Sequence, residues 1–416
     1  MWITRSYEFL TAARDRCPRG VAVPSIGRVK NLFRFRSPLR GPWLTSVFGA
    51  VLLACLPLVV LTGLLDFVAY GPGQHLPADV GWLHLPLFDW PTRPSWLFRL
   101  TQGLHVGLGL VLVPVVLAKL WSVIPKLFAW PPVRSVAHAL ERLSLLLLVG
   151  SVLFEIVTGV LNIQYDYVFG FSFYTGHYFG AWVFIASFVT HVALKLPTMI
   201  RSLRRSAPAT PRAKEPAPLT MSRRGLLGTV GGGALLVGLL TAGQTVGGPL
   251  RDLAFLLPRG TEPGEGANRY PINKTAAAAG VVVREDWRLT ITGATGRTFT
   301  RADLLALPQH MARLPIACVE GWSTVQTWTG VRLRDLAALA GVPEPASAFV
   351  SSLEQGPFAQ ATLNHGQTTD PDALLALRVN GADLSLDHGF PARIIVPALP
   401  GVHCTKWVRA LDFRSA

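Results

Sequence analysis

The first 243 residues alternate long apolar runs with short polar segments. Apolar windows lie at 43–65, 100–118, 143–161 and 177–194. Each approaches the roughly 20 residues that an α-helix, rising about 1.5 Å per residue, needs to cross a bilayer core. A fifth window, 225–243, is rich in glycine, so it is either a true span or the apolar part of an internal export signal. We expect five transmembrane helices.

Positive charge is unevenly distributed around these windows. Residues 1–40, the connection between the second and third windows, and residues 195–224 carry 9, 4 and 8 Lys or Arg, whereas the two remaining connections carry 2 and 0. Basic residues concentrate on the cytoplasmic side of membrane proteins. The net charge of +15 therefore indicates topology and not a nucleic-acid partner. We expect a multi-pass protein of the cell membrane with a cytoplasmic N-terminus and an extracytoplasmic C-terminal domain.

Composition also predicts the domain boundaries. We expect a basic tail at 1–40, four helices at 41–200 and a Pro- and Ala-rich linker at 201–222. These are followed by the fifth helix at 223–243, a second irregular linker at 244–267 and the last domain at 268–416. The last segment alternates β-type runs, such as 287–291 and 393–396, with helical patches such as 333–340. We expect an all-α membrane bundle followed by a mixed α+β domain.

Four histidines lie at matched depths in the predicted bundle. His177 and His191 are 14 residues apart in one helix, a rise of about 21 Å that leaves them on the same helix face. His105 falls at the depth of His177, and His138 at that of His191. Such pairs suit the axial ligation of two stacked haems. The alternative is that they are hydrogen-bonded histidines between helices, and His138, at a helix end, also fits a solvent-exposed histidine.

This histidine pair resembles that of the di-haem cytochromes b serving formate dehydrogenases and related quinol-linked enzymes, over residues 41–200. The resemblance implies one or two b-type haems, with a membrane quinone or quinol as redox partner. That family typically takes an inner haem ligand from helix one, where this chain has no histidine, so His138 is assigned instead. Glu155, in the outer half of the third window, is a candidate for quinone proton exchange or for a hydrogen-bonded structural role.

The C-terminal half contains the motif LPIACVEGWSTVQTWTG at 314–330. This motif resembles that of the sulfite oxidase family of molybdenum enzymes, and the resemblance makes Cys318 the single protein thiolate on molybdenum. A soft thiolate suits such a metal. Cys404 matches no ligand of the family. An extracytoplasmic compartment permits a disulfide between the two cysteines, but their spacing gives no reason to assume one.

A second block, 372–407, contains D-H-G-F-P-A-R and K-W and resembles the same family's sequence around its pterin pocket. By this resemblance Arg393 and Lys406 would bind the anionic pterin phosphate. The other cofactor-binding candidates are Asp387, His388 and His403. The segment NRYPINKT at 268–275 opens the domain as in the periplasmic methionine sulfoxide reductase catalytic subunit, which adds Asn268 and Tyr270 as candidates near the metal.

The resemblance also bears on the substrate. Glu320, two residues after Cys318, matches the C-V-E-x-W-S pattern of the sulfoxide reductase branch, and a carboxylate there should repel sulfite. Pro400 replaces the branch's pocket tyrosine. We expect a quinol-linked reductase of a small sulfoxide or N-oxide. Two alternatives stay open: oxidation of a sulfite-like substrate with electrons passed to quinone, and a non-enzymatic electron-transfer anchor.

The motif Ser222-Arg223-Arg224-Gly-Leu-Leu, directly before the fifth window, resembles a twin-arginine export signal. A domain whose pterin cofactor is inserted in the cytoplasm must cross the membrane already folded. The alternative is that the two arginines only follow the charge rule for cytoplasmic segments.

Overall fold

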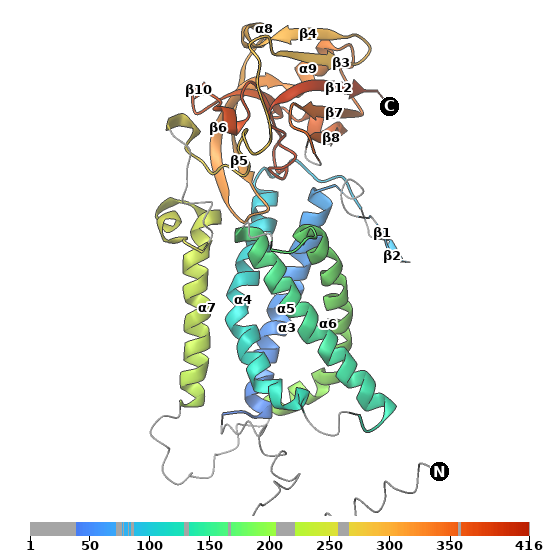
Figure 1. The fold of residues 1–416 in the computed structure, drawn as a ribbon, viewed down its shortest axis with the longest axis vertical. Helices are drawn as coiled ribbons and strands as arrows, with labels where there is room; N and C mark the ends of the chain where they lie inside the picture. Colours follow the sequence, from blue (N-terminus) through green and yellow to red (C-terminus); the bar gives the residue numbers. More distant parts are fainter. Residues whose placement is uncertain are drawn as a thin grey trace, which may run out of the picture.

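The computed structural model shows five long helices side by side, with a β-rich domain seated on one end of them (Figure 1). It describes residues 39–71, 77, 79–81, 83–84, 87–128, 133–164, 168–204, 221–256, 266–356 and 359–415. Residues 1–38 of the predicted basic tail and residues 205–220 of the predicted linker at 201–222 lie outside these residues.

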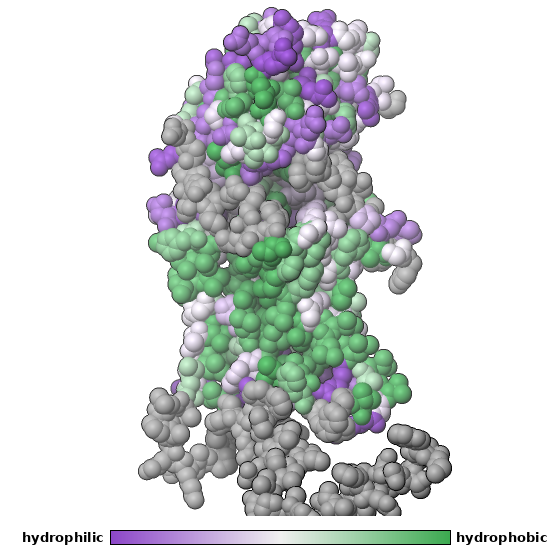
Figure 2. All heavy atoms as spheres, in the orientation of Figure 1, coloured by the Kyte–Doolittle hydropathy of each residue, from purple (hydrophilic) through white to green (hydrophobic). Residues whose placement is uncertain are grey.

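Each of the five predicted windows lies within one helix. The helices are α3 (Pro42–Ala69), α4 (Leu97–Leu127), α5 (Val136–Gln164), α6 (Phe173–Arg204) and α7 (Arg223–Val246). All five are long and apolar enough to cross a membrane. Figure 2 shows hydrophobic side chains covering the outer face of the helices, whereas hydrophilic residues cover much of the β-rich domain. The expected apolar helices are confirmed, and they are compatible with a membrane-spanning region.

Helix α7 packs against α4 at the edge of the bundle. A Cβ atom at Gly103 of α4 would lie 2.4 Å from Thr245 Cγ2 of α7, so only glycine permits this approach. At the other end, Leu226 and Leu227 pack against a buried cluster that contains Leu44. The glycine-rich fifth window is therefore a full helix that packs on α3 and α4.

The C-terminal domain contains two five-stranded sheets. One has the order β10-β9-β6-β5 with β11 paired to β9, and the other has the order β4-β3-β12-β7-β8. The strands are β3 (Arg288–Thr292), β4 (Arg297–Thr300), β5 (His310–Ala317), β6 (Ser323–Arg332), β7 (Ser347–Ser352), β8 (Gln360–Asn364), β9 (Leu374–Val379), β10 (Ala382–Asp383), β11 (Arg393–Ile395) and β12 (Val408–Arg414). The short helices are α8 (Arg301–Ala306), α9 (Leu333–Leu339) and α10 (His365–Thr369). A two-stranded hairpin between α3 and α4 consists of β1 (Asp79–Val80) and β2 (Leu83–His84).

Burial in these strands follows the sequence pattern. Strand β7 alternates half-buried and buried residues, as expected for a sheet with one face on the core, while β9 is buried along almost its whole length. Trp328 of β6 is fully buried in the core between the sheets. The predicted strands at 287–291 and 393–396 and the predicted helix at 333–340 correspond to β3, β11 and α9, so the mixed α+β prediction is confirmed.

Candidate active site

The hairpin between β5 and β6 presents the predicted ligand Cys318. Ala317 pairs with Ser323 across the hairpin, and the turn is closed by hydrogen bonds from Cys318 N to Trp322 O and from Gly321 N to Cys318 O, both 3.0 Å. Gly321 has a φ of 90°, a conformation that favours glycine. The turn therefore fixes the position of the thiol, and Cys318 is buried in it. Neither Cys318 nor Cys404 is part of a disulfide.

Cys318 faces a small pocket of about 20 Å³. Its walls are Tyr270, Pro271, Ile272, Asn273, Ile316, Cys318, Trp322, Asp387, His388, Arg393, Gly401 and Lys406. The two sequence blocks that are farthest apart in this domain, around Cys318 and around Arg393, therefore meet at one place. A volume this small accommodates a metal-sized group beside the thiol, so a whole pterin would have to extend beyond these walls.

Two cationic side chains, Arg393 and Lys406, share the pocket. Arg393 donates to His388 O and to Cys404 O, both at 3.0 Å, and its buried Nε has no hydrogen-bond partner among the described residues. Lys406 donates to Asp387 O at 3.0 Å. Burial, together with repulsion by Arg393, lowers the pKa of Lys406 to about 7. Within the described part of the chain neither cation forms an ion pair with a carboxylate, although Glu354, which pairs with Lys274, and Asp387 are close enough to attract the charge of Lys406.

Such an arrangement is unfavourable unless an anion completes it, because buried charges are normally paired. A phosphate would accept hydrogen bonds from both side chains, and the Cys318 thiolate would supply the soft donor that molybdenum needs. The donor set therefore fits a molybdenum–pterin group, with Cys318 on the metal and Arg393 and Lys406 on the phosphate.

Neighbouring side chains fix this pocket by hydrogen bonds. His388 donates from Nε2 to Tyr270 O at 3.0 Å and accepts at Nδ1 from the Ser385 hydroxyl at 2.7 Å. Burial lowers the pKa of His388 to about 4, so this imidazole is neutral at pH 7. Asp387 accepts from Ala276 N at 2.8 Å. His388 and Asp387 thus position the pocket wall while lining it.

The remaining sequence candidates do not line the pocket. Asn268 binds the turn after β10, donating to Asp383 O and accepting from Ser385 N, both at 2.9 Å.

Asn273 was not among the residues predicted from the sequence, although it lines the pocket. The signal was available, because Asn273 stands five residues later in the same NRYPINKT motif. His403, a predicted cofactor-binding residue, instead contacts the C-terminal end of α3, where its Nε2 donates to Tyr70 O at 2.7 Å.

Glu320 is buried in the Cys318 turn and accepts from Trp322 Nε1 at 2.9 Å. Burial raises the pKa of Glu320 to about 8, so the carboxyl group is mostly protonated at neutral pH. Glu320 therefore repels a sulfite anion less strongly than an ionised carboxylate at the same position would. The sequence pattern predicts a charged carboxylate here, but burial keeps the group mostly neutral.

A second cavity, of about 250 Å³, lies between helices α3, α4, α5 and α6. His105 and His177 both line it, with ring centroids 6.1 Å apart. His105 donates from Nδ1 to Val59 O at 3.0 Å, and Nδ1 of His177 is hydrogen-bonded to Thr158 Oγ1 at 3.0 Å. Nδ1 hydrogen bonds of this kind orient metal-binding histidines. In this structure Nε2 of His177 lies 3.2 Å from Glu155 Oε2.

The other predicted pair is arranged differently. His138 and His191 both lie within electrostatic reach of Glu141, but no hydrogen bond or ring contact joins them in the described part of the chain. Neither lines the cavity of His105 and His177. The structure thus brings together the predicted outer pair and leaves the inner pair apart.

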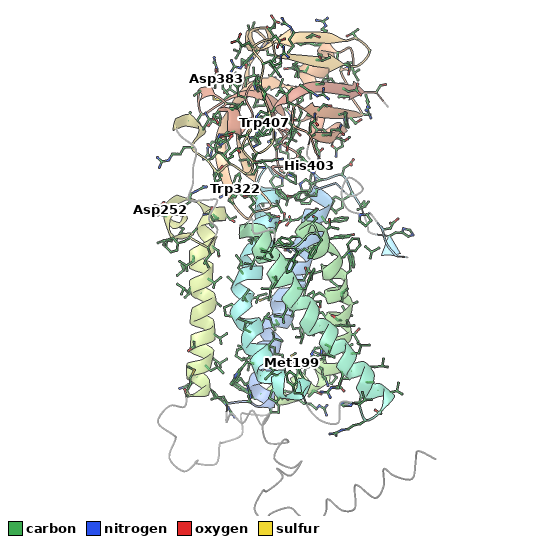
Figure 3. All side chains as sticks on the ribbon, viewed as in Figure 1. Met199, Asp252, Trp322, Asp383, His403 and Trp407 are labelled. Carbon is green, nitrogen blue, oxygen red and sulfur yellow. The ribbon has the colours of Figure 1, made fainter. Side chains whose placement is uncertain are left out.

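We call the contact between the helix ends and the loops 317–323 and 398–404 the seam. Figure 3 shows Trp322 and His403 on the side of the β-rich domain that faces the helices, with Met199 at the opposite end of the bundle. Gln102 Nε2 of α4 donates to Val319 O at 3.0 Å, and the Val319 side chain lines the helical cavity. The residue next to Cys318 therefore touches the space that contains His105.

Further hydrogen bonds join the two halves across the seam. They run from Trp90 Nε1 to Ala398 O at 2.7 Å, from Thr245 Oγ1 to Gly321 O at 3.3 Å, and from Ser323 Oγ to Thr245 O at 3.2 Å. Arg93, in the loop before α4, binds Asp370 and Asp372 of the C-terminal domain. The domain is thus attached to the bundle at several separate points.

The comparisons with known proteins concern the C-terminal domain. Residues 276–416 match the family described as oxidoreductase molybdopterin binding domain. An uncharacterized oxidoreductase of Bacillus subtilis is 33% identical over 130 residues, which cover 30% of this chain and 65% of that protein. Sulfite oxidase of Arabidopsis thaliana is 27% identical over 164 residues, which cover 31% of this chain and 42% of that enzyme. The matched region thus spans less than two thirds of either relative.

Among solved structures, a sulfane dehydrogenase from Paracoccus pantotrophus matches with 26% identity and a TM-score of 0.31, covering 36% of this chain and 43% of that chain. The family match covers both blocks that line the pocket, with Cys318 in the first and Arg393 and Lys406 in the second. Residues 276–416 are therefore similar to the molybdopterin-binding domain of oxidoreductases, including a sulfite oxidase.

Proposed function

We propose that this chain is a membrane-bound, quinol-linked molybdenum reductase that removes an oxygen atom from a small sulfoxide or N-oxide. The observation that carries the proposal is the seam, where the turn of Cys318 rests on the helix ends and Val319 reaches the cavity of His105 and His177. A metal ligand thus adjoins a space suited to a one-electron carrier. The overall reaction balances: one quinol and one sulfoxide give one quinone, one sulfide and one water.

The residues have separate roles in this proposal. Cys318 holds the metal, while Arg393 and Lys406 bind the pterin phosphate. His105 and His177 hold a b-type haem, and His138 with His191 remain the proposed ligands of a second. The molybdenum group would supply two-electron oxygen-atom transfer, and the haem would supply single-electron steps. By the charge argument of the sequence analysis, the chain has an extracytoplasmic C-terminal domain.

The pocket's two cations, Arg393 and Lys406, suit an anionic substrate such as sulfite as well as a pterin phosphate. Glu320 is mostly neutral at pH 7, so it repels such a substrate only weakly. The preference for a sulfoxide rests on the C-V-E-x-W-S motif. The experiment therefore also tests the direction of electron flow between the substrate and the quinone.

The test uses the purified full chain, assayed for molybdenum and haem. Quinol-reduced haem should be reoxidised by methionine sulfoxide or dimethyl sulfoxide in the wild type and not in Cys318→Ser, with unchanged haem content in both. If the wild-type haem is instead reduced by sulfite and ignores the sulfoxides, the chain works in the oxidising direction and the proposal is wrong.

A further inference from the structure

Polar groups line the outer end of the helical cavity, in addition to its two histidines. Asp66 and Tyr70 lie one helical turn apart along α3, near the β-rich domain, and both line the cavity. Glu155 of α5 lines it as well. The described lining thus holds two carboxylic acids but no lysine or arginine.

Three oxygen atoms of these residues are buried without a hydrogen-bond partner among the described residues: Asp66 Oδ2, Tyr70 Oη and Glu155 Oε1. Asp66 is 6% exposed and Tyr70 is 9% exposed. A buried polar atom without a partner costs on the order of 1–3 kcal/mol, and proteins rarely leave such atoms unsatisfied. Three in one cavity therefore indicate a ligand that supplies hydrogen bonds there.

The surroundings restrict the shape of this ligand. Thr101 Oγ1 donates to Asp66 Oδ1 at 2.5 Å, which fixes one carboxylate oxygen and leaves Oδ2 for a ligand. The Tyr70 ring lies 5.4 Å from the Tyr174 ring, and both rings line the cavity. Aromatic walls of this kind favour a flat ring.

The charges restrict it further. An anion is disfavoured beside two acids with no basic side chain in the described lining. A neutral donor is favoured, because carboxylate oxygens only accept hydrogen bonds. The cavity is otherwise lined mainly by apolar residues, which suits a lipophilic molecule.

We propose that the outer end of this cavity binds the hydroquinone head group, with Asp66 accepting from one of its hydroxyls and Tyr70 hydrogen-bonded to its other oxygen. This site deepens the proposed quinol-linked function and rests on it. Oxidation to the quinone releases two electrons and two protons. The electrons are those that the oxygen-transfer reaction consumes, and Asp66 Oδ2 is placed to accept one of the protons.

The site lies next to the seam. The Tyr70 backbone oxygen accepts from His403, and Val319, adjacent to Cys318, lines the same cavity. A quinol bound there lies close both to the histidines of the bundle and to the turn that holds the metal ligand. This proximity suits electron transfer without movement of the domain.

The test measures binding of duroquinol, the hydroquinone form, to the dithionite-reduced full chain in anaerobic nanodiscs by isothermal titration calorimetry, which needs no turnover. Asp66→Asn and Tyr70→Phe should each weaken binding roughly tenfold, about the effect of losing one favourable buried hydrogen bond. Tyr178→Phe is the matched control, because its hydroxyl already donates to Pro77 O, and its dissociation constant should stay within about twofold of wild type. Thermal melts of all three variants check folding.

The proposal is overturned if the wild-type chain binds no duroquinol, if both site variants bind as wild type does, or if the control weakens binding equally. Sulfoxide reduction driven by dithionite separates this result from the proposed function, since dithionite bypasses the quinol. Loss of binding in the two site variants with intact dithionite-driven turnover supports the site. Absence of dithionite-driven turnover in a wild type that still binds duroquinol through Asp66 and Tyr70 refutes the reductase function and leaves the site supported.

Discussion

The most informative structural perturbation is Arg93→Ala, because Arg93 ties the helical half to the molybdopterin domain. Its guanidinium donates to Asp370 from Nε at 3.2 Å and from Nη2 at 3.0 Å, and to Asp372 at 2.6 Å. Arg93 is 51% exposed at its side chain, whereas the Asp370 side chain is only 4% exposed. Removing the arginine leaves a buried carboxylate without its cation.

The magnitude lies between two limits. An exposed ion pair contributes about 0–1 kcal/mol, and removing one partner of a fully buried pair costs about 3–5 kcal/mol. Because Arg93 is half-exposed, and Asp370 keeps a hydrogen bond from Asp372 N at 2.8 Å, we expect about 1–2 kcal/mol. That corresponds to roughly a tenfold rise in the population with an open seam.

Hydrogen–deuterium exchange of the full chain measures this opening. Backbone amides in 317–323 and 398–404 should exchange roughly tenfold faster in Arg93→Ala, while the core strand β9 should be unaffected. Arg284→Ala is the control, since Arg284 forms a mostly exposed ion pair with Asp286, two residues away in the same loop. This pair does not join the C-terminal domain to the helices. Unchanged protection of both loops in Arg93→Ala would show that this ion pair does not hold the seam.

Three further predictions concern the pocket, the haem and export. The pKa of Lys406 is about 7 in the folded chain against 10.5 ordinarily, so between these pH values the unfolded chain binds more protons than the folded chain. The free energy of unfolding of the cofactor-free protein should therefore rise as the pH goes from about 7 to 10, by at most about 1.4 kcal/mol per pH unit. The variant Lys406→Met should lack this rise. His105→Ala and His177→Ala should each lose a b-type haem from the reduced absorption spectrum; full haem content in both would refute the assignment. Arg223→Lys combined with Arg224→Lys should leave helices α3 to α6 inserted and retain the last domain inside, and a protease-accessible domain outside would contradict this.

Local sequence was sufficient for much of this site. Cys318, Arg393 and Lys406 were predictable because each stands in a short motif whose residues fold together, in a turn for Cys318 and around β11 for Arg393. The outer histidine pair was predictable because helix geometry converts spacing into depth. In both cases the information lies within one or two neighbouring elements.

The seam could not be predicted from the sequence. Trp90 and Ala398 are 308 positions apart, and nothing in either segment indicates the other. Glu320 shows the same limitation, because its protonation depends on burial between segments distant in the chain. The roles of Asn268 and Asn273 depend on the path of the chain between η3 (Gly266–Asn268) and the pocket, which composition does not specify.

Molybdenum K-edge X-ray absorption of the purified full chain tests the central claim most directly, namely that the Cys318 thiolate holds the metal. The account predicts that Cys318→Ser loses one sulfur neighbour of molybdenum while keeping haem content and thermal stability near wild type. Cys404→Ser is the matched control: Cys404 is buried, does not line the pocket, and burial raises the pKa of its thiol, so the molybdenum environment should not change. An unchanged number of sulfur neighbours in Cys318→Ser, or an equal loss in Cys404→Ser, would contradict the assignment of Cys318 as the ligand.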